Sequence, residues 1–197
     1  NCMQESFKNG KVTTLPSVNT IADGTAVKTP GSNIFPYIKK NLDDIITVED
    51  DELIVAFLDM VENHKMIVEN SGLLTVAALK HLGVKDKRVV SILSGGNMDV
   101  ITMSSVVQQG LIFRDRIFTV SVLLPDKPGE LAKVSQTLAD VQGNVIKLEH
   151  NQFVTTNRSA AVELRITLEC FGTEHKEQII AALEKKGYKP RIVRTMI

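Results

Sequence analysis

The residues whose types and spacing best suit chemistry form a short polar turn, Ser94-Gly95-Gly96-Asn97, directly after the apolar run 88–93. The run lacks alternation, which is typical of a strand covered on both faces by helices. A helical segment is predicted to follow the turn and to extend to about Gln109. In such strand–turn–helix units ligands bind at the carboxyl end of the strand, so Ser94 is a candidate ligand-binding residue. Glycine-rich turns also serve as plain connections, and the local motif alone leaves both interpretations open.

The other polar side chains show no comparable pattern. The four histidines have no metal-ligand spacing with one another or with the cysteines, so no metal site is predicted. The carboxylates at 49–52 are interpreted as a solvated helix start, because the helix dipole stabilises negative charge there.

Composition argues against several classes of function. The 197 residues are 43% hydrophobic and 23% charged, as in an ordinary soluble globular protein. Basic and acidic residues number 23 each, so no basic face for nucleic acid or anionic membranes is expected. No apolar run approaches the roughly 18 residues needed to span a bilayer. Cys2 and Cys170 indicate neither a disulfide scaffold nor a thiolate metal site, and two reduced thiols suit a cytoplasmic protein.

The first part of the chain has an α/β pattern that is incomplete by itself. Its expected elements are helices over 1–10, 35–42, 49–61 and 73–80 and strands over 44–48 and 88–93. The clearest helix carries apolar residues at three- and four-residue spacing along 53–61. Two or three strands cannot close a doubly wound sheet alone. The missing strands are therefore expected upstream, or the segment folds in another way.

After Gly110 the pattern changes to that of a small, separate domain. The clearest strand, 162–170, alternates apolar and polar residues, as a half-buried strand does. The expected elements are strands over 118–124, 144–153, 162–170 and 191–194 and helices over 130–141 and 173–186. Their order, β-α-β-β-α-β, is the ferredoxin-like split unit. The sequence therefore predicts two domains, 1–112 and 113–197, with the boundary near residues 112–116.

Three short stretches resemble the fold-type II pyridoxal-phosphate enzymes that deaminate threonine and serine, a group that includes serine racemase. The stretches are 20–24, 68–72 and 93–97, in the order and at the separations of that family. The resemblance implies that 1–112 is the C-terminal portion of a doubly wound catalytic domain whose cofactor is pyridoxal 5'-phosphate. The cofactor-binding residues that it implies are Ser94, Gly24, Glu69, Gly95 and Asn97.

Within this resemblance the hydroxyl of Ser94 meets the pyridine nitrogen of the cofactor, Glu69 lies near the ring, and Gly24 packs close to the cofactor. A neutral hydroxyl can only share a hydrogen bond with that nitrogen. A carboxylate there would keep the nitrogen protonated and make the ring a stronger electron sink. The weaker sink suits β-elimination, because loss of the substrate hydroxyl relieves the developing negative charge.

The lysine that forms the family's Schiff base is not expected in this chain. Ser6-Phe7-Lys8-Asn9-Gly10 imitates its motif, but the arginine before the glycine is missing. Lys8 also lies close before Asp23, whereas the family's lysine lies far upstream of the matching stretch. Lys8 is therefore interpreted as a surface lysine, and no catalytic residue is assigned. The chain is expected to be a fragment that is inactive alone.

The second segment resembles ACT domains over its full length, carried by the stretches 124–131 and 143–146. In that family the turn between the first strand and the first helix binds an amino-acid effector, usually where two domains meet. The effector-binding residues that this implies are Asp126, Pro128, Gly129, Glu130, Leu131 and Asn144. Gly129 lets the backbone approach a ligand, and the helix start offers free N–H groups to a carboxylate. A capped helix start without any ligand is the alternative.

The expected function is that of a threonine and serine ammonia-lyase, which converts L-threonine to 2-oxobutanoate and ammonia in the cytoplasm. The expected partners are an amino-acid substrate, an amino-acid effector and further copies of the chain, in a dimer or tetramer held by ACT–ACT association. Two alternatives stay open: a non-catalytic, ACT-containing regulatory module that binds amino acids, and a serine racemase-like enzyme. The appended ACT domain favours a feedback-regulated dehydratase over a racemase.

Overall fold

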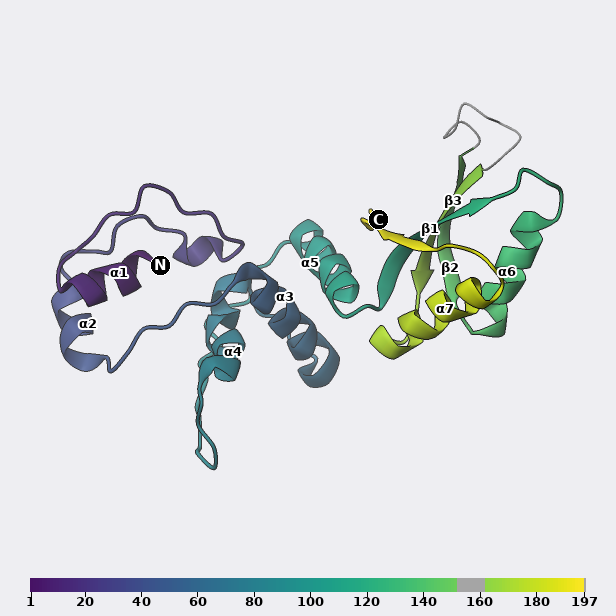
Figure 1. Ribbon diagram of the computed structural model, residues 1–197. Coiled ribbons are helices and arrows are strands. Elements are labelled where there is room, and N and C mark those ends of the chain that lie inside the picture. Colours follow the sequence, from purple (N-terminus) through teal and green to yellow (C-terminus); the bar gives the residue numbers. More distant parts are fainter. Residues whose placement is uncertain (152–161, 197) are drawn as a thin grey trace. The chain divides into compact units, whose positions relative to one another are not determined.

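The computed structural model describes residues 1–151 and 162–196, and the chain divides into two compact units, Asn1–Val107 and Gln108–Ile197 (Figure 1). Helix α5 (Val100–Phe113) crosses this division. The boundary predicted after residue 112 lies inside α5, and it stays a prediction. Within the described residues, none of the helices has the length and apolar character that a bilayer span requires.

The first unit is built from short helices and loops. The helical elements before α5 are α1 (Cys2–Asn9), η1 (Asp23–Thr25), α2 (Phe35–Asn41), α3 (Asp50–Asp59), the π-helical turn η2 (Met60–His64), η3 (Asn70–Leu73), α4 (Leu74–Ala77) and η4 (Ala78–His81). Helix α1 ends as predicted, because Gly10 adopts a left-handed conformation with φ of 68°. The apolar stripe of α3 is also confirmed, since Leu53 and Phe57 are fully buried against Val68 and Leu73.

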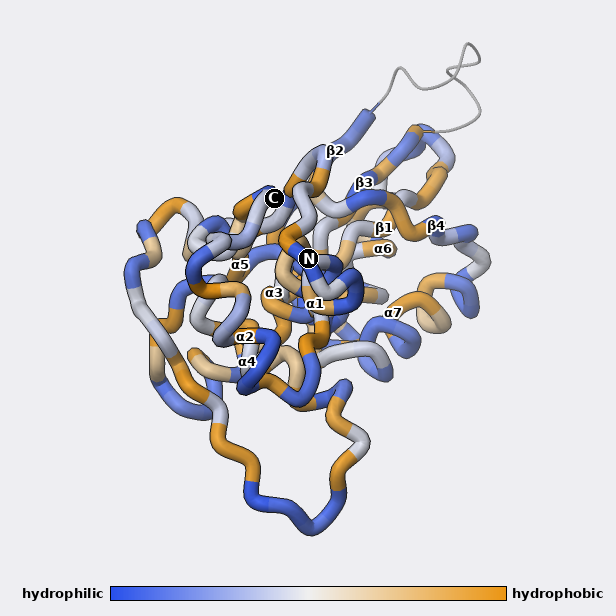
Figure 2. The backbone as a smooth tube through the Cα atoms, turned by 90° about the vertical axis from the view of Figure 1, so that its left-hand side faces the viewer, coloured by the Kyte–Doolittle hydropathy of each residue, from blue (hydrophilic) through white to orange (hydrophobic). Residues whose placement is uncertain are grey.

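Three secondary-structure predictions for the first unit are wrong. Residues 44–48 and 88–93 form no strand, and the helix expected over 73–80 is broken into α4 between two 3-10 turns. An apolar strand needs neighbouring strands to satisfy its backbone groups, and the described part of this unit contains none. Val90 is accordingly 89% exposed. The loop after α4 extends away from the neighbouring helices, with its hydrophilic residues 85–88 at the tip (Figure 2).

The start of α3 is stabilised by the carboxylate of Glu52. This carboxylate accepts hydrogen bonds from Lys80 Nζ at 2.7 Å and from the backbone N–H of Glu49 at 2.8 Å, and it lies 2.9 Å from His81 Nε2. The first two contacts, with the help of His81, lower the pKa of Glu52 to about 2. Glu49 and Glu52 also form a reciprocal capping box.

Replacing Glu52 with glutamine is expected to lower the free energy of unfolding by up to about 1 kcal/mol near neutral pH, because glutamine can keep the cap hydrogen bond but loses the charge that pairs with Lys80 and favours the helix start. The pKa of Glu52 is lower in the folded chain than the ordinary 4.5. Its stabilisation is therefore fully present above pH 4.5 and is lost as the pH falls toward 2. Urea unfolding of the two chains between pH 7 and pH 2 measures the difference. A difference that stays constant over this range contradicts the assignment, and Asp51→Asn, in the same turn, is the control.

The second unit is a four-stranded antiparallel sheet with two helices on one face (Figure 1). Its elements are β1 (Ile117–Leu124), α6 (Glu130–Asp140), β2 (Asn144–Asn151), β3 (Val162–Glu169), α7 (Thr173–Lys185) and β4 (Arg191–Val193), and the strand order is β2-β3-β1-β4. The predicted β-α-β-β-α-β order is confirmed. The predicted end of the second strand, at Phe153, lies outside the described residues.

The core of this unit follows from strand alternation. Every second residue of β1 and β3 points to the helices, and the side chains of Val120 and Ile166, which are register partners, are fully buried. Val134 and Leu138 of α6 and Ile179 of α7 close this core. Both cysteines are free and buried.

Candidate functional site

The three stretches singled out in the first unit meet in space. The side-chain amide of Asn70 donates a hydrogen bond to the carbonyl of Ile21 at 3.0 Å, which joins the first stretch to the second. The backbone N–H of Glu69 donates to the carbonyl of Gly95 at 3.2 Å, which joins the second stretch to the third. Residues far apart in sequence therefore form one cluster, and Ser94 lies at its edge as an exposed residue.

Glycines permit this close approach. A Cβ atom on Gly24 would lie 2.8 Å from the hydroxyl of Ser71, and one on Gly72 would lie 2.9 Å from Val68 Cγ1. Gly95 has φ of 146°, and a Cβ there would lie 2.7 Å from the Glu69 carboxylate. A larger residue at any of these positions would require the neighbouring side chains to shift. Sequence reasoning named Gly24 and Gly95 but not Gly72, although Gly72 ends the second stretch.

Glu69 lies beside the turn that carries Ser94. Its carboxylate accepts a hydrogen bond from the backbone N–H of Asn97 at 3.1 Å, while its own N–H holds the carbonyl of Gly95. Glu69 therefore braces both ends of the turn that carries Ser94. This bracing is a positioning role, and it needs no ligand.

Polar groups without internal partners border the same cluster. Among the described residues, the buried Ser71 hydroxyl and the buried side-chain oxygen of Asn70 have no hydrogen-bond partner. A buried polar group of this kind costs free energy unless it is satisfied. The Ser94 hydroxyl also makes no hydrogen bond to the described residues. These hydroxyl and amide groups, next to closely approaching glycines, fit a polar planar cofactor.

The Lys8 side chain is not part of this cluster. It is exposed on α1 and lies 3.8 Å from the carboxylate of Glu5 one turn away. This placement agrees with its interpretation as a surface lysine.

The turn between β1 and α6 is the second candidate site. Gly129 has φ of 91° and precedes α6 directly, and a Cβ there would meet no atom within 4 Å. Asp126, Pro128 and Leu131 are exposed around it. Glu130 is bound by Lys133 Nζ at 2.7 Å, which raises the pKa of Lys133. The turn thus offers open space beside free backbone N–H groups at the α6 start.

Two family models match separate parts of the chain. Residues 1–95 match the family of pyridoxal-phosphate dependent enzymes, and residues 118–187 match the ACT domain family. The chain is 37% identical to an L-threonine ammonia-lyase of Geobacter sulfurreducens over 93% of this chain and 46% of the relative. It is 33% identical to an L-threonine ammonia-lyase of Thermotoga maritima over 97% of this chain and 48% of the relative.

The chain joins a pyridoxal-phosphate dependent enzyme segment to an ACT domain. Together the two parts fit the C-terminal part of a threonine dehydratase. The chain spans about half the length of the curated relatives it matches. Among solved structures, threonine deaminase isoform 2 from Solanum lycopersicum is similar with a TM-score of 0.51 and 29% identity, over 54% of this chain and 32% of that one.

Within one ACT domain, the predicted effector residues do not all come together. Asn144 pairs with Glu169, which pairs with Ile117 at the start of β1, whereas the Gly129 turn follows Leu124 at the end of β1. At about 3.3 Å per strand residue, the two positions are roughly 20 Å apart. The Asn144 amide instead donates to the Glu169 carboxylate at 3.0 Å. A single chain therefore cannot place Asn144 and the turn on one small ligand.

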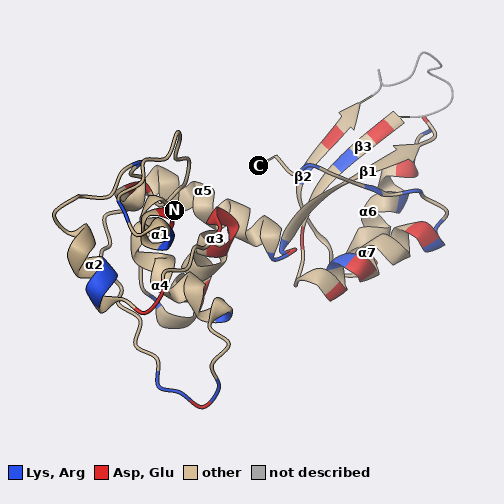
Figure 3. Cartoon of the chain, turned by 60° about the vertical axis from the view of Figure 1, so that its left-hand side comes forward, with Lys and Arg blue, Asp and Glu red and all other residues tan. Residues whose placement is uncertain are grey.

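The ACT sheet face opposite the helices carries a self-paired polar network. The hydroxyls of Thr119 and Thr167 lie 3.0 Å apart, Ser121 donates to Glu163 at 2.7 Å, and Arg165 pairs with Glu163 at 3.1 Å. The hydrogen bond from Ser121 and the Arg165 charge lower the pKa of Glu163. Acidic and basic residues are interspersed on these strands (Figure 3). This face therefore carries both positive and negative charges.

Proposed function

We propose that this chain supplies the C-terminal part of a cytoplasmic, pyridoxal-phosphate-dependent threonine ammonia-lyase that also accepts serine, with an amino-acid effector bound at the ACT domain. The observation that carries the proposal is the meeting of the three stretches at the Ser94 turn. The named ammonia-lyase relatives supply the reaction and the substrate. The Schiff-base lysine is proposed to lie in the part of the relatives that this chain does not span. The boundary between the two domains is proposed to follow residue 112.

The residues proposed to hold the cofactor act by binding and positioning. The Ser94 hydroxyl would share a hydrogen bond with the pyridine nitrogen, and Glu69 fixes the turn through Gly95 and Asn97. Gly24 lets the chain approach the cofactor closely. When bound, pyridoxal phosphate supplies the electron sink for loss of the substrate's α-proton and β-hydroxyl. A neutral hydroxyl at Ser94 keeps that sink weak, which suits elimination.

The test uses the protein that contains this chain together with the residues preceding it in its gene. Ser94→Ala is expected to weaken cofactor binding about fivefold, because it removes one hydrogen bond worth about 1 kcal/mol. Ser94→Asp is expected to raise the share of transamination-type by-products. Cofactor titration by absorbance and product analysis measure the two effects. Ser91→Ala is the matched control, because the Ser91 hydroxyl faces the Thr75 carbonyl at 3.5 Å.

Each outcome of this test decides between interpretations. Threonine-dependent formation of 2-oxobutanoate supports the ammonia-lyase, and formation of D-serine as the main product supports the racemase-like alternative. A protein that binds neither cofactor nor substrate but still binds an amino acid is a regulatory module. Unchanged cofactor affinity and product ratios in both Ser94 variants would contradict the proposed contact between Ser94 and the pyridine nitrogen.

The effector site is proposed to form between two chains. β2 is an edge strand of the sheet, and its apolar Val145, Ile146 and Leu148 are between 38% and 46% exposed. Antiparallel pairing of two such edges would set the start of one β2 beside the end of the other. That end, Asn151, is level with Leu123, next to the Gly129 turn. The pairing therefore brings Asn144 of one chain toward the turn of the second.

A further inference from the structure

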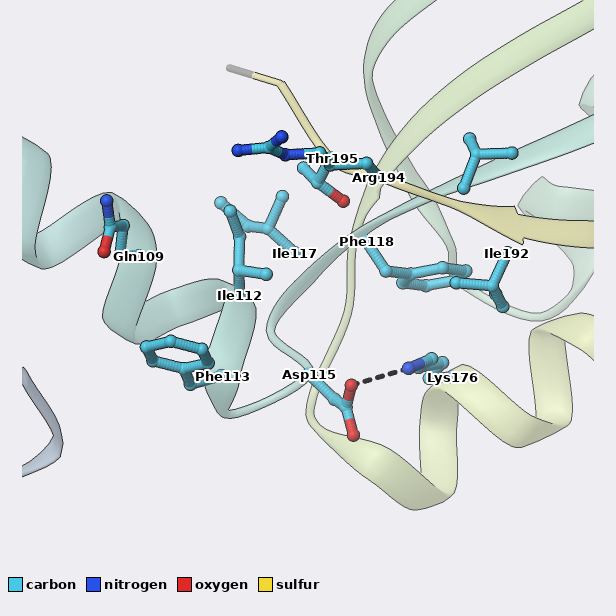
Figure 4. A pocket seen from close by; sticks show the side chains of 11 residues that line it. Gln109, Ile112, Phe113, Asp115, Ile117, Phe118, Lys176, Ile192, Arg194 and Thr195 are labelled. Carbon is cyan, nitrogen blue, oxygen red and sulfur yellow. Dashed lines mark hydrogen bonds and ion pairs between the residues drawn. The ribbon is translucent and has the colours of Figure 1, made fainter. Parts of the chain in front are cut away.

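The second unit, Gln108–Ile197, is called the ACT unit below, and it contains a cavity. This cavity shares no lining residue with the Ser94 cluster or with the Gly129 turn. It has a volume of about 430 Å³ and lies between the last turn of α5, the first residues of β1, α7 and the chain after β4 (Figure 4). Small-ligand sites commonly have roughly 300–1,000 Å³. The cavity is therefore large enough for a ligand of several carbon atoms.

The walls of this cavity are mainly apolar. Ile112 from α5, Ile117 and Phe118 from β1, and Ile192 from β4 line it. Phe118 is only 3% exposed, whereas Ile192 is 52% exposed. A hydrocarbon group placed here would cover aliphatic surface that the described residues leave open. Its burial would contribute about 25 cal/mol per Å² of apolar surface removed from water.

The carboxylate at the floor of the cavity is already engaged. Asp115, which has φ of 52°, accepts hydrogen bonds from Lys176 Nζ at 2.6 Å and from the Thr173 hydroxyl at 2.9 Å. The hydrogen bond from Lys176 lowers the pKa of Asp115. The thiol of Cys170 lies 2.7 Å from the backbone carbonyl of Asp115, and Lys176 Nζ lies 5.7 Å from the centre of the Phe118 ring. The charges of Asp115 and Lys176 therefore neutralise each other, and these contacts hold the Asp115 side chain in place.

The remaining charge at the cavity is positive. Figure 4 shows the Arg194 guanidinium extending over Ile112 and Ile117 toward Gln109. Arg194 is exposed and has no carboxylate partner among the described residues. A guanidinium binds carboxylates through two parallel hydrogen bonds. Gln109 adds an amide that can donate to the same group.

We propose that this cavity binds a branched aliphatic monocarboxylate without an ammonium group. The carboxylate pairs with Arg194 and Gln109, and the hydrocarbon contacts the isoleucine side chains. An amino acid is disfavoured, because its ammonium group would lose water without gaining a free carboxylate. The ligand therefore differs from the amino acid proposed at the Gly129 turn, and the inference does not depend on the cofactor. The proposed ligand contacts Gln109 and Ile112 of α5, the helix that begins in the first unit.

The test is a titration of the 197-residue chain with 4-methylpentanoate, followed by the NMR signals of labelled isoleucine methyl groups. The methyl signals of Ile112, Ile117 and Ile192 are expected to shift together at millimolar ligand. Arg194→Gln is expected to weaken binding about tenfold or more, because a charge-assisted hydrogen-bonded pair is lost. Arg191→Gln removes the same charge from β4 but does not line the cavity, and it should bind normally.

Two further probes separate the parts of the proposal. Leucine has the same carbon skeleton with an added ammonium group, and 4-methylpentan-1-ol lacks the carboxylate. Both are expected to bind at least about tenfold more weakly. Leucine would lose water from its ammonium group without gaining a carboxylate partner, and the alcohol would lose the charged pair with Arg194. Equal binding of leucine, equal binding by Arg194→Gln, or no shift of the three methyl signals would each overturn the proposal.

Discussion

Replacing Gly129 with valine is expected to abolish the thermal stabilisation of the chain by its amino-acid effector. A branched side chain there would fill the space that the backbone leaves open before α6. Isoleucine is expected to be the strongest stabiliser of the unchanged protein, followed by valine. Melting temperatures measured with each of the twenty amino acids at millimolar concentration test both statements. If no amino acid shifts the midpoint, the ACT domain serves assembly alone.

The backbone at Gly129 makes a control necessary. Its φ of 91° strains any L side chain, so the valine variant is expected to lose about 1–2 kcal/mol even without ligand. Gly187 has φ of 87°, and a Cβ atom on it would likewise meet no atom within 4 Å. Gly187→Val therefore introduces similar strain at a position that is not one of the proposed effector residues. The effector shift should survive in that variant, and its loss in both would indicate a general structural effect.

Replacing Ile166 with alanine is expected to lower the free energy of unfolding of the ACT unit by about 2–5 kcal/mol. Ile166 lies on the central strand β3 between Val120 and Leu148, and its side chain is completely buried. Truncation leaves a cavity that the two neighbouring strands cannot close. For a domain of this size, each kcal/mol corresponds to a fall in the midpoint of roughly 4–8 °C. Thermal and urea unfolding measure the loss.

Leu123→Ala is the control for the core substitution. Leu123 lies on the neighbouring strand β1, but it is 49% exposed. Its truncation is expected to change the free energy of unfolding by no more than about 0.5 kcal/mol. Similar losses in both variants would contradict the assignment of the core to the alternate residues that face α6 and α7.

The fold of the ACT unit could be predicted because its signals are local. The alternation along 162–170 and the apolar spacing in α6 and α7 determine which faces are buried without knowledge of distant residues. The register shift between Val145 and Lys147 could not be predicted in this way. It depends on how β2 fits the neighbouring strand, which is a long-range property.

The first unit was predicted less well because its strands depend on partners. The run 88–93 has the composition of a buried strand, but a strand forms only where a second backbone accepts its hydrogen bonds. The described residues of this unit provide no such neighbour, so the run forms no strand and leaves Val90 and Ile92 exposed. Helix α3, whose burial is set by its own periodicity, was predicted correctly.

The candidate sites show the same limit. Family resemblance identified the stretches that contain Gly24, Glu69 and Ser94, but not that Glu69 braces the turn through Asn97. The separation of Asn144 from Gly129 could not be predicted from the sequence either, because it depends on the strand register. The cavity at Arg194 depends on the packing of four separate segments, and no motif signals it.

The distance between Gly129 and Asn144 has a consequence for how an effector response would scale. If one ligand contacts the turn of one chain and Asn144 of another, ligand binding and chain association become a single linked equilibrium. The effector then tightens the dimer by the same factor by which dimerisation tightens effector binding. Half-saturation would fall as protein concentration rises, and the sensitivity of the regulated activity would vary with how much of the protein a cell contains.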